Sequence, residues 1–207
     1  MSETAATAAT ALITQGLETL EAMAREAGLV PACDEFFFLR HGETAGNASR
    51  TFQPLDEPLN AQGHQQARAA AAILGGASFS RIIASDLPRA WLTAGKVAAA
   101  SGHPVQPEAL IRERFFGDWI GAPSAGFDWR HDPPGGETLA TFVARTLLGL
   151  QKNLAQGDRP LLVAHGGNLH VLRGALGVPW DAAHTGNALP LHFRRTRQGW
   201  SMVALSR

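Results

Sequence analysis

Two arginines and two histidines stand at or near the ends of short apolar runs that lie far apart in the chain. Arg40 and His41 directly follow the first run, Arg89 lies just beyond the second, and His165 directly follows the third. These runs are residues 36–39, 81–85 and 161–164. Since the carboxyl ends of parallel strands meet at one edge of an open α/β sheet, we expect the four side chains to converge. They would form a cationic cup, and its natural ligand is a phosphate group.

The same residues suggest a reaction. A neutral His41 could attack phosphorus, because the cations Arg40 and Arg89 lower the pKa of a neighbouring imidazole. A covalent phosphohistidine would split one difficult displacement into two easier ones. Phosphoryl transfer needs mainly positioning and charge compensation, so this set requires no metal and no cofactor. A protonated His165 would add a donor to the phosphate oxygens, and Glu113 is a suitable carboxylate to protonate the leaving alkoxide.

Alternating strands and helices are expected to position these side chains. The three apolar runs predict buried strands, and two further strands are expected near the end of the chain, at 189–196 and 200–206. Helical spacing, caps and glycine stops predict the helices between them. These are expected at 11–27, 61–74, 86–101, 137–156 and 168–177. The alternation predicts an α/β fold with a mainly parallel central sheet covered on both faces.

Composition excludes several classes of protein. The chain has 207 residues, 45% of them hydrophobic, and a formal net charge of zero. A neutral chain lacks the basic excess of a nucleic-acid binder. The single cysteine, Cys33, cannot form an internal disulfide and suits a reducing cytosol. No apolar run reaches the ~18–20 residues of a membrane span, and no secretory signal is evident at the N-terminus. We therefore expect a cytoplasmic protein with no membrane partner.

The chain divides into an N-terminal extension, residues 1–34, and a single domain, residues 35–207. The extension contains the expected amphipathic helix 11–27, which ends near Gly28 and Pro31. This helix would pack on the body of the domain, and a contact in a homodimer is the alternative.

Serial motifs then give a resemblance to a known family. They are "LRHGET" with Asn47 a few residues on, "PLNAQGHQQA", "ASDLPRAWLTA", "RERFFGDWIG", "PGGET" and "VAHGG". In this order, over about residues 36 to 172, they resemble the histidine phosphatase superfamily, also called phosphoglycerate-mutase-like. The resemblance implies a three-layer α/β/α sandwich, in agreement with the pattern of elements.

The resemblance also implies roles for individual residues. His41 would be the phosphorylated nucleophile, Glu113 the general acid and His165 the second histidine of the phosphate pocket. Arg40, Asn47 and Arg89 match the phosphate-binding positions. Asn47 could instead be a helix cap, and Glu113 a surface ion-pair partner. Glu137 is better read as a carboxylate in the first turn of a helix than as a catalyst.

Departures from the family pattern indicate the branch. The usual W-E-G reads Trp119-Ile120-Gly121 here, and the segment from Gly121 to Gly136 is short. A short segment makes an open pocket that admits water, which favours a compact phosphatase over a mutase. Glu113 favours phosphate esters of alcohols, whose alkoxide needs a proton. The expected pocket wall is Phe115, Phe116, Phe127, Trp129, Arg130 and His131.

We therefore predict a metal-independent phosphomonoesterase that hydrolyses a small-molecule phosphate ester through a phosphohistidine on His41. One alternative is phosphoryl transfer of the phosphoglycerate mutase type. Another is a non-catalytic protein that binds phosphorylated ligands, and a third is a metal-dependent hydrolase using His41 and His165. The last would need carboxylate ligands close by in sequence, and only Glu43 qualifies.

Overall fold

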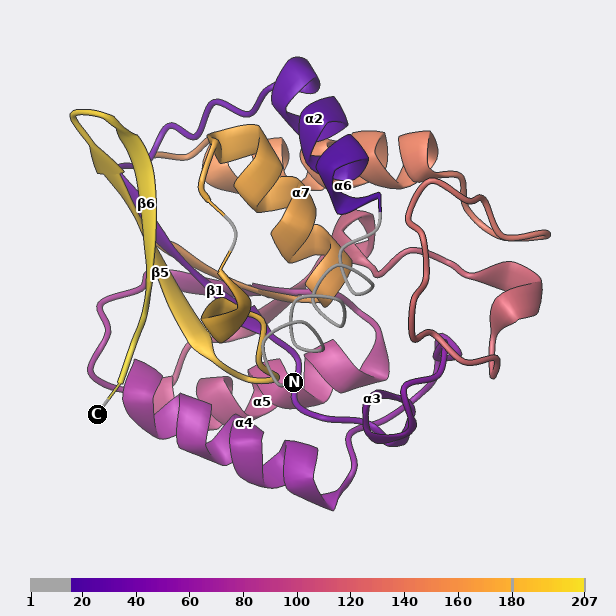
Figure 1. Cartoon of the computed structure of the whole chain (residues 1–207). Helices are drawn as coiled ribbons and strands as arrows, with labels where there is room; N and C mark the ends of the chain where they lie inside the picture. Colours follow the sequence, from indigo (N-terminus) through magenta and orange to yellow (C-terminus); the bar gives the residue numbers. More distant parts are fainter. Residues whose placement is uncertain (1–15, 180, 207) are drawn as a thin grey trace, which may run out of the picture.

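A six-stranded mixed sheet forms the centre of the computed structural model, which describes residues 16–179 and 181–206. The strand order is β3-β2-β4-β1-β5-β6 (Figure 1). Strands β3, β2, β4 and β1 run parallel, while β5 and β6 are antiparallel additions beside β1. The strands are β1 (Glu35–Arg40), β2 (Arg81–Ala84), β3 (Val105–Pro107), β4 (Pro160–Ala164), β5 (Pro190–Thr196) and β6 (Gly199–Ala204). The predicted α/β class with a mainly parallel sheet is confirmed.

Helices cover both faces of this sheet. Helices α2, α6 and α7 lie on one face, and α4 and α5 lie on the other (Figure 1). The α-helices are α2 (Leu17–Ala27), α3 (Ala45–Ser49), α4 (Ala61–Leu74), α5 (Pro88–Ser101), α6 (Leu139–Leu154) and α7 (Gly166–Leu176). Short 3-10 helices are η1 (Ala109–Ile111), η2 (Gly117–Trp119) and η3 (Ala182–His184). The result is a three-layer α/β/α sandwich.

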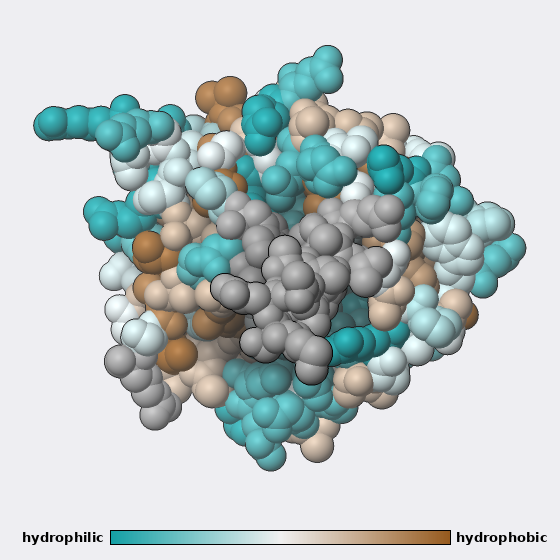
Figure 2. Space-filling view, viewed as in Figure 1, coloured by the Kyte–Doolittle hydropathy of each residue, from teal (hydrophilic) through white to brown (hydrophobic). Residues whose placement is uncertain are grey.

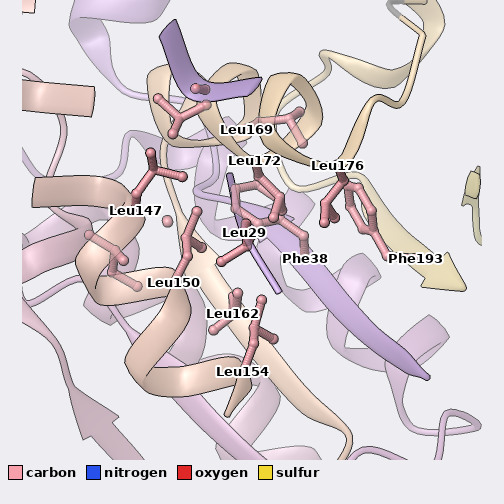
Figure 3. Packing of buried hydrophobic residues seen from close by; sticks show 14 of the residues in the cluster. Leu29, Phe38, Leu147, Leu150, Leu154, Leu162, Leu169, Leu172, Leu176 and Phe193 are labelled. Carbon is pink, nitrogen blue, oxygen red and sulfur yellow. The ribbon is translucent and has the colours of Figure 1, made fainter. Parts of the chain in front are cut away.

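The central strands β1, β2 and β4 are mostly apolar because both faces of the sheet are buried there. In β1, Phe36 and Phe38 enter the core beneath α2, α6 and α7, whereas Phe37 and Leu39 enter the core beneath α4 and α5. Figure 3 shows the first of these cores, in which Phe38 lies among leucines of α6 and α7. Removal of the Phe38 ring would cost about 3–5 kcal/mol of unfolding free energy, since it is fully buried.

Local signals explain where the helices begin. Asn60 caps α4 by accepting a hydrogen bond from Gly63 N at 2.8 Å, as its position in the sequence predicts. Helix α5 begins at Pro88, two residues later than expected, and Asp86 forms an ion pair with Arg112. Helix α6 begins at Leu139, two residues later than expected, because Thr138 is the residue that caps it. The short elements β3 and α3 were not predicted.

The helix of the N-terminal extension packs within the chain. Helix α2 lies against α7 and α6, and its Leu17, Leu20 and Ala24 are buried. The expected beginning of this helix at residue 11 lies outside the described residues. On the face shown in Figure 2, hydrophobic residues are interspersed among hydrophilic ones. None of the helices in the described ranges is long and apolar enough to cross a membrane.

Candidate active site

The carboxyl ends of β1, β4 and β2 lie side by side and carry the predicted residues. His41 extends the ladder of β1, with its N–H donating to Ala164 O at 2.9 Å. Ser85 extends β2 in the same way, with its N–H donating to Val163 O. His165 directly follows β4, so its ring lies beside that of His41, with 5.1 Å between the ring centroids. Residues separated by more than a hundred positions therefore meet at one edge, as the alternating pattern predicts.

Backbone contacts define the orientation of the His41 ring. Its Nδ1 lies 2.7 Å from Gly42 O. A carbonyl oxygen only accepts hydrogen bonds, so Nδ1 carries the proton and Nε2 keeps its lone pair. Burial and the charges of Arg40 and Arg89 hold the pKa of His41 well below its ordinary 6.5. The arrangement therefore presents a neutral imidazole with a free Nε2, the form that can act as a nucleophile.

Two arginines supply positive charge around this ring. Arg40 Nη1 donates to Thr185 O at 2.7 Å, and Arg89 Nη1 donates to Pro54 O at 3.1 Å. Burial lowers the pKa of both arginines, and the nearby Glu113 carboxylate opposes that effect. Because each guanidinium uses part of its donor set on a carbonyl, its orientation is defined while other donors remain for a ligand.

His165 is fully buried at the start of α7. Its Nε2 lies 2.8 Å from Ser85 Oγ, and its backbone N–H donates to Asn168 Oδ1. Burial, followed by the charges of Arg89, His41 and Arg40, holds the pKa of His165 well below 6.5. The expected proton on His165 is therefore disfavoured in the free site, and a bound dianion would be needed to restore it.

Several buried nitrogens around His41 have no hydrogen-bond partner among the described residues. Arg40 Nε, Arg89 Nε and His165 Nδ1 are three of the four buried side-chain nitrogens in the described residues that have no hydrogen-bond partner. Buried polar atoms are normally paired, because leaving one unsatisfied costs about 1–3 kcal/mol. All three belong to residues around His41, and two of them are part of positively charged guanidinium groups. The site therefore has the donors and the charge to bind an anion with several oxygens.

A loop between η1 and η2 brings Glu113 to this site. Its two carboxylate oxygens accept hydrogen bonds from Gly167 N at 3.1 Å and from Arg114 N at 3.0 Å. Arg145 of α6 supports the loop by donating to the carbonyls of Leu110 and Arg112, at 2.8 and 3.1 Å. The first turn of α7 and the side chain of Arg145 thus hold the carboxylate beside the arginines.

Glu137 belongs to this support. It forms an ion pair with Arg145 at 2.7 Å, and its backbone N–H donates to Phe115 O. The sequence predicted Glu137 in the first turn of a helix, but Glu137 precedes Thr138, the cap of α6. Its ion pair with Arg145 stabilises the loop of Glu113 instead.

Three further residues hold the segment around His41, and none of them was among the predicted site residues, although Ser85 and Thr93 lie within the motif that contains Arg89. Asn187 Nδ2 donates to His41 O at 3.0 Å and to Asn47 Oδ1 at 3.1 Å. Thr93 Oγ1 accepts a hydrogen bond from Gly42 N, and Ser85 contacts His165. The Asn47 oxygen also accepts from the N–H of Thr44, so that side chain forms the capping box of α3 beside the site.

Aromatic side chains form a wall next to the loop of Glu113. Phe52 and Phe116 have ring centroids 4.4 Å apart, and Phe127 meets both edge-on. A cavity of about 370 Å³ opens beside them. Its lining is Phe52, Trp119, Ala122, Pro123, Ala125, Gly126, Phe127, Asp128 and His131. Of the expected wall residues, Phe127 and His131 line this cavity, whereas Arg130 is half-exposed and paired with Asp128.

No group of three His, Cys, Asp or Glu side chains within the described ranges could hold a metal ion. The donor set around His41 is cationic, so the residues present fit an anion rather than a cation.

Comparison with known proteins identifies the family. The model of the histidine phosphatase superfamily (branch 1) matches residues 36–207. The chain belongs to this superfamily. It is 38% identical to a glucosyl-3-phosphoglycerate phosphatase of Mycolicibacterium vanbaalenii, over 69% of this chain and 74% of that protein. It is 34% identical to a protein of Salmonella choleraesuis named "Probable phosphoglycerate mutase GpmB", over 70% and 76% of the two chains.

Solved structures of the superfamily share the fold. A mycobacterial glucosyl-3-phosphoglycerate phosphatase in complex with VO3 is 28% identical to this chain and superposes with a TM-score of 0.67. The match covers 84% of this chain and 98% of that one. The phosphoglycerate-mutase-like sandwich expected from the motifs is thus confirmed.

Proposed function

We propose that His41 is the nucleophile of this histidine phosphatase and that its substrate is the phosphate monoester of a small alcohol. The enzyme class itself follows from the superfamily and from relatives that are phosphatases of small molecules. The observation that carries the assignment to His41 is its neutral ring, with Nδ1 bound to Gly42 O and Nε2 free, among unpaired buried donors.

The reaction would proceed in two steps. Nε2 of His41 attacks phosphorus, the bond from phosphorus to the ester oxygen breaks, and the carboxyl group of Glu113 gives that oxygen a proton. Water then attacks the phosphohistidine, Glu113 takes a proton from the water, and inorganic phosphate leaves with His41 neutral again. Arg40 and Arg89 stabilise the charge of the transferring group in both steps, so no metal ion is required.

His165 and Asn47 have supporting roles in this proposal. His165 Nδ1 is buried and unpaired, so it can donate to a phosphate oxygen once the dianion is bound. Asn47, joined to His41 O through Asn187, lies at the edge of the same pocket, where its amide would bind another oxygen.

The alcohol part of the ester would lie along the aromatic wall. Phe52, Trp119 and Phe127 offer apolar faces, and Asp128 and His131 add polar groups to the same cavity. Such a lining suits an alcohol that has both an apolar face and hydroxyl groups. Glucosyl-3-phosphoglycerate, named in several relatives, is the first substrate to test.

We also propose that the protein works in the cytoplasm. Its single cysteine, Cys33, is buried and free, and burial raises the pKa of the thiol. Such a thiol suits a reducing compartment. Recovery of the native protein in the periplasmic or secreted fraction of its host would contradict this location.

Hydrolysis of an aryl phosphate with EDTA present tests the function. Wild type should release phosphate, and His41→Asn, which changes little volume, should lose about 10³-fold or more in kcat. Quenching in an alkaline denaturant should leave the labelled phosphoryl group on wild type but not on the variant, and later acid treatment should release it, as expected for an acid-labile phosphohistidine rather than a stable ester. Full activity in His41→Asn, or loss of wild-type activity with EDTA, would refute the proposal. The mutase alternative predicts turnover of phosphoglycerate only when a bisphosphate is added.

A further inference from the structure

We propose that helix α2 of the N-terminal extension positions Trp129 against the aromatic wall of the substrate pocket, so that the extension helps select the alcohol part of the ester. This inference rests on the proposed function and concerns residues outside the family match. The match begins at residue 36, whereas α2 spans Leu17–Ala27. The contacts below are therefore a feature of this chain that the family as such does not supply.

The first contact is between the beginning of α2 and the backbone around Trp129. Gly16 precedes the helix with a φ of +76°. A Cβ atom on Gly16 would lie 3.0 Å from Trp129 N and 3.0 Å from Arg130 N, and it would overlap Asp128 Oδ1. Backbone atoms cannot move aside as a flexible side chain can. Gly16 is thus required for the helix and the 128–130 segment to approach this closely.

The second contact runs through side chains. Glu21 of α2 pairs with the buried Arg173 at 3.1 Å and lies 3.7 Å from His170 Nδ1. The His170 ring meets the indole of Trp129 edge-on, with 6.3 Å between the centroids. Helix α2 is therefore connected to Trp129 in two ways. Gly16 lies against the Trp129 backbone, and Glu21 reaches the indole ring through His170.

Trp129 in turn borders the catalytic groups. Its indole is close to Gly167, since a Cβ atom there would lie 3.0 Å from Trp129 Cη2. Gly167 is the residue whose N–H binds Glu113. Trp129 O accepts a hydrogen bond from Arg114 Nη1 at 2.8 Å, so the segment is fixed from the side of the acid loop as well.

These contacts connect the N-terminal extension to the aromatic wall of the pocket. The Trp129 ring also stacks edge-on with Phe127 at 5.6 Å, and Phe127 lines the 370 Å³ cavity. A shift of the 128–130 segment would move the surface that the alcohol contacts, while the phosphate pocket on β1 and β4 would keep its own supports. The extension should therefore affect selectivity without affecting binding of phosphate.

A matched pair of glycines tests the proposal. Gly16 and Gly28 flank α2 with φ values of +76° and +75°, but a Cβ atom on Gly28 would meet nothing within 4 Å. Gly28→Ala introduces at least as much backbone strain as Gly16→Ala, because the ψ of Gly28 is 158° and that of Gly16 is -1°, but only Gly16→Ala disturbs the 128–130 segment. For each variant, kcat/KM is measured for naphthyl phosphate and phenyl phosphate, which differ in the size of the alcohol part but have leaving groups of similar basicity, together with inhibition by inorganic phosphate and the melting temperature.

Gly16→Ala should change the ratio of kcat/KM for the two esters by about tenfold, since small displacements of positioning groups have effects of this size. Inhibition by inorganic phosphate should stay within about twofold of wild type, because uniform phosphate binding is retained. Gly28→Ala should change the melting temperature but not the ratio. Equal ratios in wild type and both variants would overturn the inference.

A double-mutant cycle shows whether Trp129 carries the effect. If α2 acts through this ring, Gly16→Ala should no longer change the substrate ratio in a Trp129→Leu background. An undiminished effect in that background would reject Trp129 as the intermediary. The proposed function fails in a different way, namely through full activity of His41→Asn, which the glycine variants do not influence.

Discussion

Replacement of Glu113 by glutamine removes the group that would donate the proton and keeps the rest of the side chain in place. Glutamine has almost the same shape, but it offers one acceptor oxygen where the carboxylate offers two. One of the two donors, Gly167 N or Arg114 N, then loses its partner. A hydrogen bond to a charged group contributes about 1.5–3 kcal/mol, so the free energy of unfolding should fall by about that amount.

The catalytic effect should depend on the leaving group. General acid catalysis contributes about 10²–10⁴-fold, equivalent to about 3–5 kcal/mol of barrier. An alkyl phosphate, whose alkoxide needs a proton, should lose this factor in kcat/KM. A nitrophenyl phosphate, whose phenolate leaves unaided, should lose less than about tenfold. The parameter kcat/KM is the right one because it excludes hydrolysis of the phosphohistidine, in which Glu113 also takes part in the proposed mechanism.

Phosphate binding provides an internal check. Glu113 opposes the positive charges of Arg40 and Arg89, so its neutralisation should leave inhibition by inorganic phosphate unchanged or stronger. Glu57→Gln is a matched control, because Glu57 also accepts a backbone N–H, that of Gly46, and also acts on Arg89. Equal losses for both esters in Glu113→Gln, or the same leaving-group dependence in Glu57→Gln, would refute the role of Glu113.

Three further predictions concern the supports of the site. Burial and the nearby arginines hold the pKa of His41 and His165 below 6.5, so the unfolded chain binds more protons than the folded one below that pH. The free energy of unfolding should therefore fall on acidification, by up to about 1.4 kcal/mol per pH unit for each histidine, and denaturant titrations from pH 7.5 to 5.5 would show no such slope if the reasoning is wrong. Arg145→Met would leave the partly buried Glu137 without its partner and should cost about 1–3 kcal/mol of stability, with a loss of kcat/KM that is larger for alkyl than for aryl phosphates. If both esters lose activity equally, the pair does not act through the loop of Glu113. Gly63→Ala would place a Cβ atom 2.7 Å from Glu43 N and should destabilise by about 1–3 kcal/mol, whereas the helical control Gly95→Ala, with nothing within 4 Å, should not; equal melting curves would contradict this.

The core of the fold was accessible from the sequence because its signals are local. Apolar runs such as 36–39 and 161–164 predict strands, and the cap Asn60 marks the beginning of a helix without reference to the rest of the chain. Element boundaries were less certain, as at α6, where Glu137 was expected in the first turn but Thr138 caps the helix. The three-residue strand β3 has no periodicity long enough to detect.

The order of motifs and strand ends in the sequence indicated the candidate site residues. Strand ends followed by Arg40-His41 and His165 imply one shared edge, since parallel strands align their carboxyl ends. Tertiary structure alone decided what holds them there. The deciding contacts are those of Asn187 with His41 O, of Arg145 with the loop of Glu113 and of Gly16 with Trp129. The first two join residues 146 and 35 positions apart in the chain. Such contacts depend on how packed layers bring backbones together, and no local spacing in the chain encodes them.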